Sequence, residues 1–168
     1  QGTTSRSIDT TKKISAQEAI QDKFLYISSF GTVDELKTRY ENGARVNFRN
    51  IKGETALIRV LEGPYDEQTL LKYKYLVSVG AQVDLKGMSA RGHYVTPLDA
   101  AVWKSSSVFK SSSASKSPFF AEQVLRYLIE EGADVSGSDK NGRTPLHIAA
   151  KSNNLFAARF LLESGAEV

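Results

Sequence analysis

The sequence predicts an all-α solenoid of four helix-turn-helix units joined by β-hairpin-like loops. Two recurring phrases support this fold class. The phrase Gly-Ala-x-Val occurs four times and ends at Val46, Val83, Val135 and Val168. A phrase of Thr followed by Pro-Leu or Ala-Leu marks the start of three units, at Thr55, Thr96 and Thr144. Such self-similarity is typical of stacked repeats, each of which buries its apolar face only against its neighbours.

The unequal spacing of the phrases locates three insertions. Successive valines of the first phrase are 37, 52 and 33 residues apart, so the first two intervals carry 4 and 19 extra residues. Surface loops absorb such additions at low cost. Four extra residues fall around Gly63–Glu67, four in the hairpin across Lys86–Tyr94, and fifteen in a segment at about 104–118. The predicted units are about 14–46, 47–83, 84–135 and 136–168.

The first unit lacks the Thr phrase and is predicted to be an N-terminal cap. Residues 1–13 are polar and are expected to form a flexible tail. Ala16–Ser29 has apolar residues on one helical face, which predicts a first helix. A turn at Phe30-Gly31 then leads to a second helix over Thr32–Glu41. The solenoid domain therefore spans 14–168.

The later units carry helix-boundary signals. Thr55, Thr96 and Thr144 are placed to accept hydrogen bonds from first-turn amides. Pro97 and Pro145 follow at the first helical position, where a missing N–H costs nothing. The third unit departs most from the pattern, because the segment at about 104–118 is rich in Ser and Lys and is expected to be a solvated loop.

The units resemble the ankyrin repeat, most closely over 139–168, and the resemblance covers roughly 16–168. It implies binding of a protein partner through the hairpin tips and the exposed face of each first helix. Tyr94 stands where the repeat has glycine, which makes the shape of that turn uncertain. The predicted partner-binding residues, of which seven lie in the segments that carry the insertions, are Arg49, Ile51, Lys52, Glu54, Tyr65, Met88, Arg91, His93, Tyr94, Trp103, Lys104, Phe109, Lys140, Asn141, Arg143 and Lys151.

Trp103 is the strongest single candidate, since it is the only tryptophan and lies beside the long insertion on the concave face. Exposed tryptophans often anchor a partner. The alternative is that the inserted loop folds back and covers the ring. The sequence leaves both interpretations open.

Composition excludes several classes of protein. The 168 residues are 40% hydrophobic and 24% charged, as in soluble domains, and no apolar run suggests a transmembrane helix. A net charge of +3 is too small to indicate nucleic acid binding. The absence of cysteine excludes disulfides and thiolate metal sites. It fits a cytoplasmic location and, slightly better, a bacterial periplasmic one.

No catalytic, metal or cofactor site is predicted. His147 lies in Thr-Pro-Leu-His, where the resemblance implies hydrogen bonds within and between repeats. His93 lies on a hairpin without matching carboxylates for a metal site. Ser107–Lys110 and Ser113–Lys116 fit Ser-x-x-Lys, but companion nucleophile elements are missing, and a Ser/Lys-rich segment produces such matches by composition.

Two functional hypotheses remain. The first is an interaction module for a protein partner. The second is a stoichiometric inhibitor or immunity protein that blocks an enzyme such as a bacterial hydrolase. Phe156 and Phe160 are also expected to form an apolar patch on the last unit. We expect this end to be covered by another copy or by the partner, unless the natural chain continues.

Overall fold

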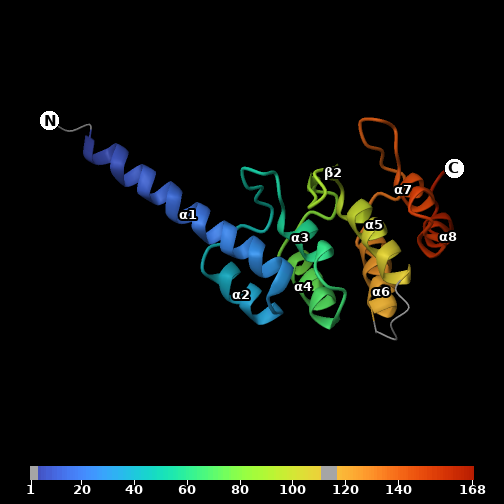
Figure 1. The fold of residues 1–168 in the computed structure, drawn as a ribbon. Helices are drawn as coiled ribbons and strands as arrows, with labels where there is room; N and C mark the ends of the chain where they lie inside the picture. Colours follow the sequence, from blue (N-terminus) through green and yellow to red (C-terminus); the bar gives the residue numbers. More distant parts are fainter. Residues whose placement is uncertain (1–3, 111–116) are drawn as a thin grey trace.

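A computed structural model describes the backbone of residues 4–110 and 117–168 and the side chains of 15–108 and 118–168. Helix pairs follow one another in a row, and the hairpins project on one side of it (Figure 1). The only strands among the described residues form one short hairpin. The predicted all-α solenoid is confirmed.

The first unit consists of α1 (Thr4–Phe30) and α2 (Val33–Glu41). The helix begins at Thr4, so the backbone of 4–13 is helical where a flexible tail was expected over 1–13. The start of α2 is fixed by a capping box: Thr32 Oγ1 accepts from the Glu35 amide at 3.3 Å, and Glu35 Oε2 accepts from the Thr32 amide at 2.8 Å.

The second unit consists of α3 (Ala56–Glu62) and α4 (Glu67–Ser78). Thr55 caps α3, as predicted, by accepting from the Ile58 amide. The inserted residues form the connection between the helices. Asp66 ends this connection and caps α4 by accepting from the Thr69 amide at 3.0 Å.

The third unit begins with a hairpin of β1 (Gly87–Met88) and β2 (Tyr94–Val95), followed by α5 (Pro97–Lys110) and α6 (Ser117–Glu130). The tip closes through a bond from the Ser89 amide to the His93 carbonyl at 2.8 Å, as in the neighbouring hairpins. Relative to those hairpins, each arm is two residues longer, which accounts for the four inserted residues. The left-handed position belongs to Gly92 (φ 76°), so Tyr94 can occupy a strand.

The structure corrects the expected loop at about 104–118. Residues up to Lys110 continue α5, and Ser105 and Ser106 are buried. The Ser105 hydroxyl accepts a 2.7 Å bond from the Asn154 side chain, and the Ser106 hydroxyl donates to the Ser152 carbonyl at 3.3 Å. This part of the insertion therefore packs against the fourth unit. Residues 111–116 lie outside the described part of the chain.

The fourth unit consists of α7 (Pro145–Lys151) and α8 (Leu155–Glu163), and Gly165 follows in the predicted left-handed conformation (φ 92°). The two phenylalanines of α8 do not form the expected exposed patch. Phe156 and Phe160 are partly buried against the core with their rings stacked 6.1 Å apart, and Arg126 lies 5.2 Å from the Phe160 ring centroid.

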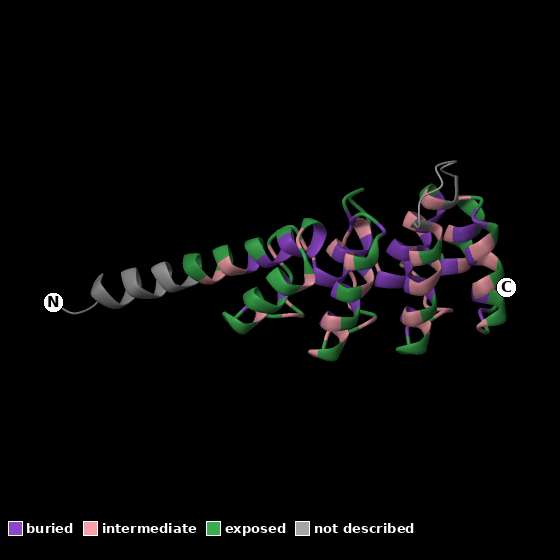
Figure 2. Ribbon diagram, turned by 90° about the horizontal axis from the view of Figure 1, so that it is seen from below, coloured by how far each residue is buried: buried purple, intermediate pink, exposed green. Residues whose placement is uncertain are grey.

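The core runs along the length of the stack. Buried residues occupy the inner faces of successive helices, as Figure 2 shows. Phe24, Leu61, Val102 and Leu161, one from each unit, are at most 1% exposed. Each pair of helices is thus stabilised mainly by burial against the next pair. In the described part of the chain, we find no helix with the length and apolarity needed to cross a bilayer.

Candidate protein-binding groove

The hairpin tips are held by similar short-range bonds. Asn50 and Asp139 each donate a backbone amide to the carbonyl four residues later, at 3.2 and 2.9 Å. Their side chains also accept amide bonds from the same turn. Residues between these anchors face solvent, and Ile51 is 96% exposed. The tips are therefore rigid turns that present outward side chains.

Basic side chains connect successive hairpins. Arg49 Nε donates to the Lys86 carbonyl at 2.8 Å, and the Arg49 guanidinium lies 5.8 Å from the Tyr94 ring centroid. Lys86 Nζ donates in turn to the Ser138 carbonyl at 3.4 Å. These contacts fix the spacing of the second, third and fourth tips.

Two adjoining cavities of about 240 and 560 Å³ lie between the third and fourth units. They share a set of lining residues and are here called the Trp103 groove. The hairpin of the third unit, the hairpin of the fourth, and the first helices α5 and α7 form its walls. The shared lining residues are His93, Val95, Asp99, Trp103 and Ile148.

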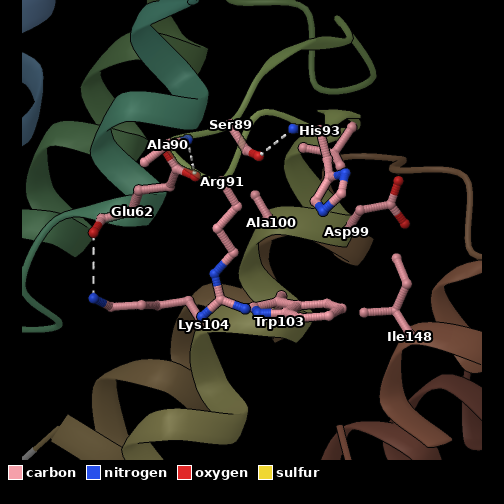
Figure 3. Close-up of a pocket in the computed structure, with 11 residues that line it drawn as sticks. Glu62, Ser89, Ala90, Arg91, His93, Asp99, Ala100, Trp103, Lys104 and Ile148 are labelled. Carbon is pink, nitrogen blue, oxygen red and sulfur yellow. Dashed lines mark hydrogen bonds between the residues drawn. The ribbon is translucent and has the colours of Figure 1, made fainter. Parts of the chain in front are cut away.

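Trp103 is half-buried in this groove, which matches neither of the two interpretations fully. The guanidinium carbon of Arg91 lies 4.6 Å from the Trp103 ring centroid, and Lys151 Nζ lies 5.8 Å from it. Figure 3 shows the Arg91 side chain reaching down from the hairpin to lie against the indole. The ring is thus covered by a cation rather than freely exposed.

The acidic groups of the groove are engaged in local bonds. Both carboxylate oxygens of Glu62 lie within 3.0 Å of the Ala90 amide, which holds the long hairpin against α3. Asp99 Oδ2 accepts from the Thr96 amide at 3.1 Å. Burial raises the pKa of Glu62 and of Asp99. Asp99 Oδ1 has no hydrogen-bond partner among the described residues.

At the fourth tip, Asp139 has the opposite shift. The Arg143 amide and side chain, with the Asn141 amide, donate to its carboxylate and lower its pKa to about 2. The Arg143–Asp139 ion pair has a nitrogen–oxygen distance of 2.7 Å. Asp139 is therefore a carboxylate at neutral pH and orders its own turn.

The structure brings ten of the sixteen predicted binding residues to the Trp103 groove. They are Met88, Arg91, His93, Tyr94, Trp103, Lys104, Lys140, Asn141, Arg143 and Lys151. The second hairpin carries four more, of which Arg49 contacts the third hairpin and Glu54 pairs with Arg59 at 3.7 Å, while Ile51 and Lys52 are exposed.

The two remaining predicted residues, Tyr65 and Phe109, are not among the described residues that line the groove. Tyr65 is only 4% exposed and does not line the groove, so its side chain presents little surface to a partner. The side chain of Phe109 lies outside the described residues.

Sequence reasoning missed several lining residues. Ile148 and Val95 line both cavities, and their apolar character alone does not distinguish them from core residues. Asp99 had a detectable signal, since it replaces the histidine of Thr-Pro-Leu-His. In the fourth unit that histidine makes the predicted bond within the repeat: His147 Nδ1 lies 2.9 Å from Thr144 Oγ1. The described residues contain no group of three or more potential metal ligands.

Comparison with known proteins agrees with the stacked helix pairs. The family described as ankyrin repeats (3 copies) matches residues 114–168. Human ankyrin repeat and SOCS box protein 6 is 32% identical over 160 residues, which cover 90% of this chain and 33% of that protein. The chain belongs to the ankyrin-repeat family. Ankyrin repeats are protein-interaction modules, which agrees with the general function predicted above.

In other relatives, the region matched by this chain is a smaller share of the relative's length. Human NF-kappa-B inhibitor zeta is 31% identical over 134 residues, covering 72% of this chain and 18% of that protein. L-asparaginase of Dirofilaria immitis is 24% identical over 156 residues and is covered to 26%. This ankyrin chain thus spans about a third or less of these relatives. They are animal proteins and give no support to the expected bacterial origin.

Proposed function

We propose that this ankyrin-repeat chain is a protein-interaction module whose main contact surface is the Trp103 groove with the flanking hairpin tips. The observation that carries the proposal is the convergence of the third and fourth hairpins on one half-buried tryptophan. Tryptophan and arginine are the residues most enriched among energetically dominant interface contacts. Rigid tips also reduce the entropy cost of binding.

The groove has the mixed character of a protein-binding site. Met88, Val95 and Ile148 supply apolar surface, whereas Lys140 and Asn141 at the fourth tip supply exposed polar groups. An apolar centre with a polar rim is typical of protein interfaces. The concave arrangement also gives a partner segment access to two repeats at once.

The narrower hypothesis of an enzyme inhibitor rests on the concentration of insertions in the third unit. Part of that support is lost, because Lys104–Lys110 continues α5, and Ser105 and Ser106 in this segment pack against the fourth unit. The long hairpin remains as the feature that a single dedicated partner would select. Assaying the catalytic activity of any captured enzyme with and without the chain tests this hypothesis.

The test of the interaction module compares capture of cellular proteins by three forms of the immobilised chain. We expect a specific protein to be retained by the wild type and lost, by about tenfold or more, from Arg91→Ala/Trp103→Ala. Arg159→Ala in α8, an exposed arginine that does not line the groove, is the matched control. Equal capture by all three folded forms would show that the groove is not the contact surface.

A further inference from the structure

The Trp103 groove holds an excess of positive charge that the rest of the chain does not share. Its lining includes six lysine and arginine residues and three carboxylates, an excess of +3. The whole chain also carries +3, so its remaining charges balance. The six basic residues are Lys86, Arg91, Lys104, Lys140, Arg143 and Lys151.

The basic residues differ in whether their donors are already occupied. Lys86 and Lys104 donate to the carbonyls of Ser138 and Glu62, and Arg143 is paired with Asp139. Arg91 and Lys151 are exposed and contact the indole of Trp103. Within the described part of the chain, neither donates a hydrogen bond or forms a close ion pair, although Arg91 lies near enough to Glu62 for its charge to oppose the rise in the pKa of that carboxyl.

Stacking on the indole prepares Arg91 to bind an anion. The guanidinium is planar, so when its face lies against a ring its N–H donors remain free in the plane. Those donors match the two oxygens of a carboxylate. Because the ring restrains the guanidinium before binding, less side-chain entropy is lost on association. Lys151 adds a second charge against the same ring.

We infer that Arg91 and Lys151, held on Trp103, form a receptor for an aspartate or glutamate side chain of the protein partner. The inference rests on the proposed function. Ile148 lines both cavities of the groove and Met88 lines the one that Lys151 also lines, and these side chains favour an apolar residue next to the acidic one. The acidic side chain would occupy the donors that the chain itself leaves unused.

The same features argue against a nucleic acid strand. A base would have to displace Arg91 to stack on the indole. Glu62, Asp99 and Asp139 are interspersed among the cations and would repel a continuous line of phosphates. A single carboxylate between Arg91 and Lys151 meets neither obstacle.

The experiment uses the intact chain and a random peptide library displayed on phage, with selected peptides resynthesised as C-terminal amides. We expect groove-dependent peptides to contain Asp or Glu, and replacement of that residue by Asn or Gln to weaken binding about tenfold. The amide excludes a terminal carboxylate as the source. In Arg91→Ala/Lys151→Ala the same replacement should change affinity by less than about twofold, because the two changes remove one interaction.

Arg91→Lys tests whether the planar guanidinium is needed or a positive charge is enough, because lysine keeps the charge and lacks the paired N–H donors in one plane. It should weaken acidic peptides by about fivefold or more, whereas Arg159→Lys should not. Circular dichroism confirms folding of each variant, and Trp103→Phe provides a milder test of the stacking base. Groove-dependent peptides without an acidic residue would overturn the carboxylate receptor and leave the proposed function standing. Peptides that bind all groove variants equally, or a selection without binders, would overturn both.

Discussion

The guanidinium carbon of Arg91 lies 4.6 Å from the centre of the Trp103 ring, so a residue of the long third hairpin covers the only tryptophan of the chain. The contact joins the hairpin to α5. Such cation–π contacts contribute about 0.5 to 2 kcal/mol, depending on exposure. The fluorescence of Trp103 reports on it without need of a partner.

Arg91→Ala should therefore expose Trp103 to water. We expect its emission maximum to shift to longer wavelength and its quenching by acrylamide to increase, while helicity stays unchanged. Arg159→Ala is the matched control and should alter neither signal. Emission that is identical in Arg91→Ala and wild type would show that the stacked arrangement is not populated in solution.

Asn154 is predicted to be a principal link between the third and fourth units. Its side chain caps α8 by accepting from the Ala157 amide at 3.1 Å, and donates to Ser105 Oγ at 2.7 Å and the Val102 carbonyl at 3.1 Å. Asn154→Ala should lower the free energy of unfolding in urea by about 2 to 3 kcal/mol. The adjacent exposed Asn153 has φ 52°, so Asn153→Gly should be nearly neutral.

The same contacts predict the effect of removing the insertion. Deleting 105–117 would remove Ser105 and the end of α5, and should destabilise the fourth unit to a similar extent as Asn154→Ala. A deletion variant with unchanged urea stability would show that these buried serines contribute nothing.

Lys72 is a buried cation at the junction of the first and second units. Its ammonium donates to the Ser28 carbonyl at 2.8 Å and to the Ser29 carbonyl at 3.4 Å, near the end of α1. Lys72→Met should lower stability by about 1 to 3 kcal/mol at neutral pH, because these carbonyls lose their donor. Lys74→Met on the exposed face of the same helix is the control.

Lys72 should also give a pH dependence. Burial lowers its pKa below the ordinary value of 10.5, so in the alkaline window ending near 10.5 the unfolded chain binds more protons than the folded one. The stability of the wild type relative to Lys72→Met should therefore rise with pH through that window. Urea denaturation of both proteins measures the difference, and a constant or falling difference would contradict it.

Asp139 should act at the acid end. Its pKa is about 2 in the folded chain against an ordinary 3.8, so its stabilising effect is complete above pH 3.8 and is lost as pH falls through about 2. Asp139→Ala should be less stable than wild type at neutral pH and equal to it below about pH 2. A carboxyl titration by NMR with a midpoint near the ordinary value would contradict the predicted turn bonds.

The order of the units can be predicted from sequence because local chemistry marks their boundaries. Thr55 marks a helix start because its side chain caps the first turn, and Gly165 marks a helix end because it adopts the left-handed conformation. Neither role depends on what the residue packs against. The end of α5 cannot be predicted in this way. Serine and lysine favour solvated loops by composition, whereas Ser105 is a buried helical residue that bonds to the distant Asn154.

The candidate site shows the same division. The repeat register places Arg91 on a tip and Trp103 on a first helix, so both can be predicted as binding residues. Their stacking depends on a hairpin whose two arms are each longer by two residues, and on the Glu62 carboxylate that holds its Ala90 amide. Such long-range contacts leave no periodic signal in the sequence.

The bonds that Lys72, Lys104 and Asn154 send across unit boundaries have a consequence for how this chain can be rearranged. Each donor lies in the later unit and reaches a carbonyl of the earlier one, at Ser28, Glu62 and Val102 respectively. The three donors occupy different positions within their units, so each boundary between units is held by a different pair of donor and acceptor. Shuffled or duplicated units would meet without matching groups, and this short array should resist the modular recombination that uniform consensus repeats permit.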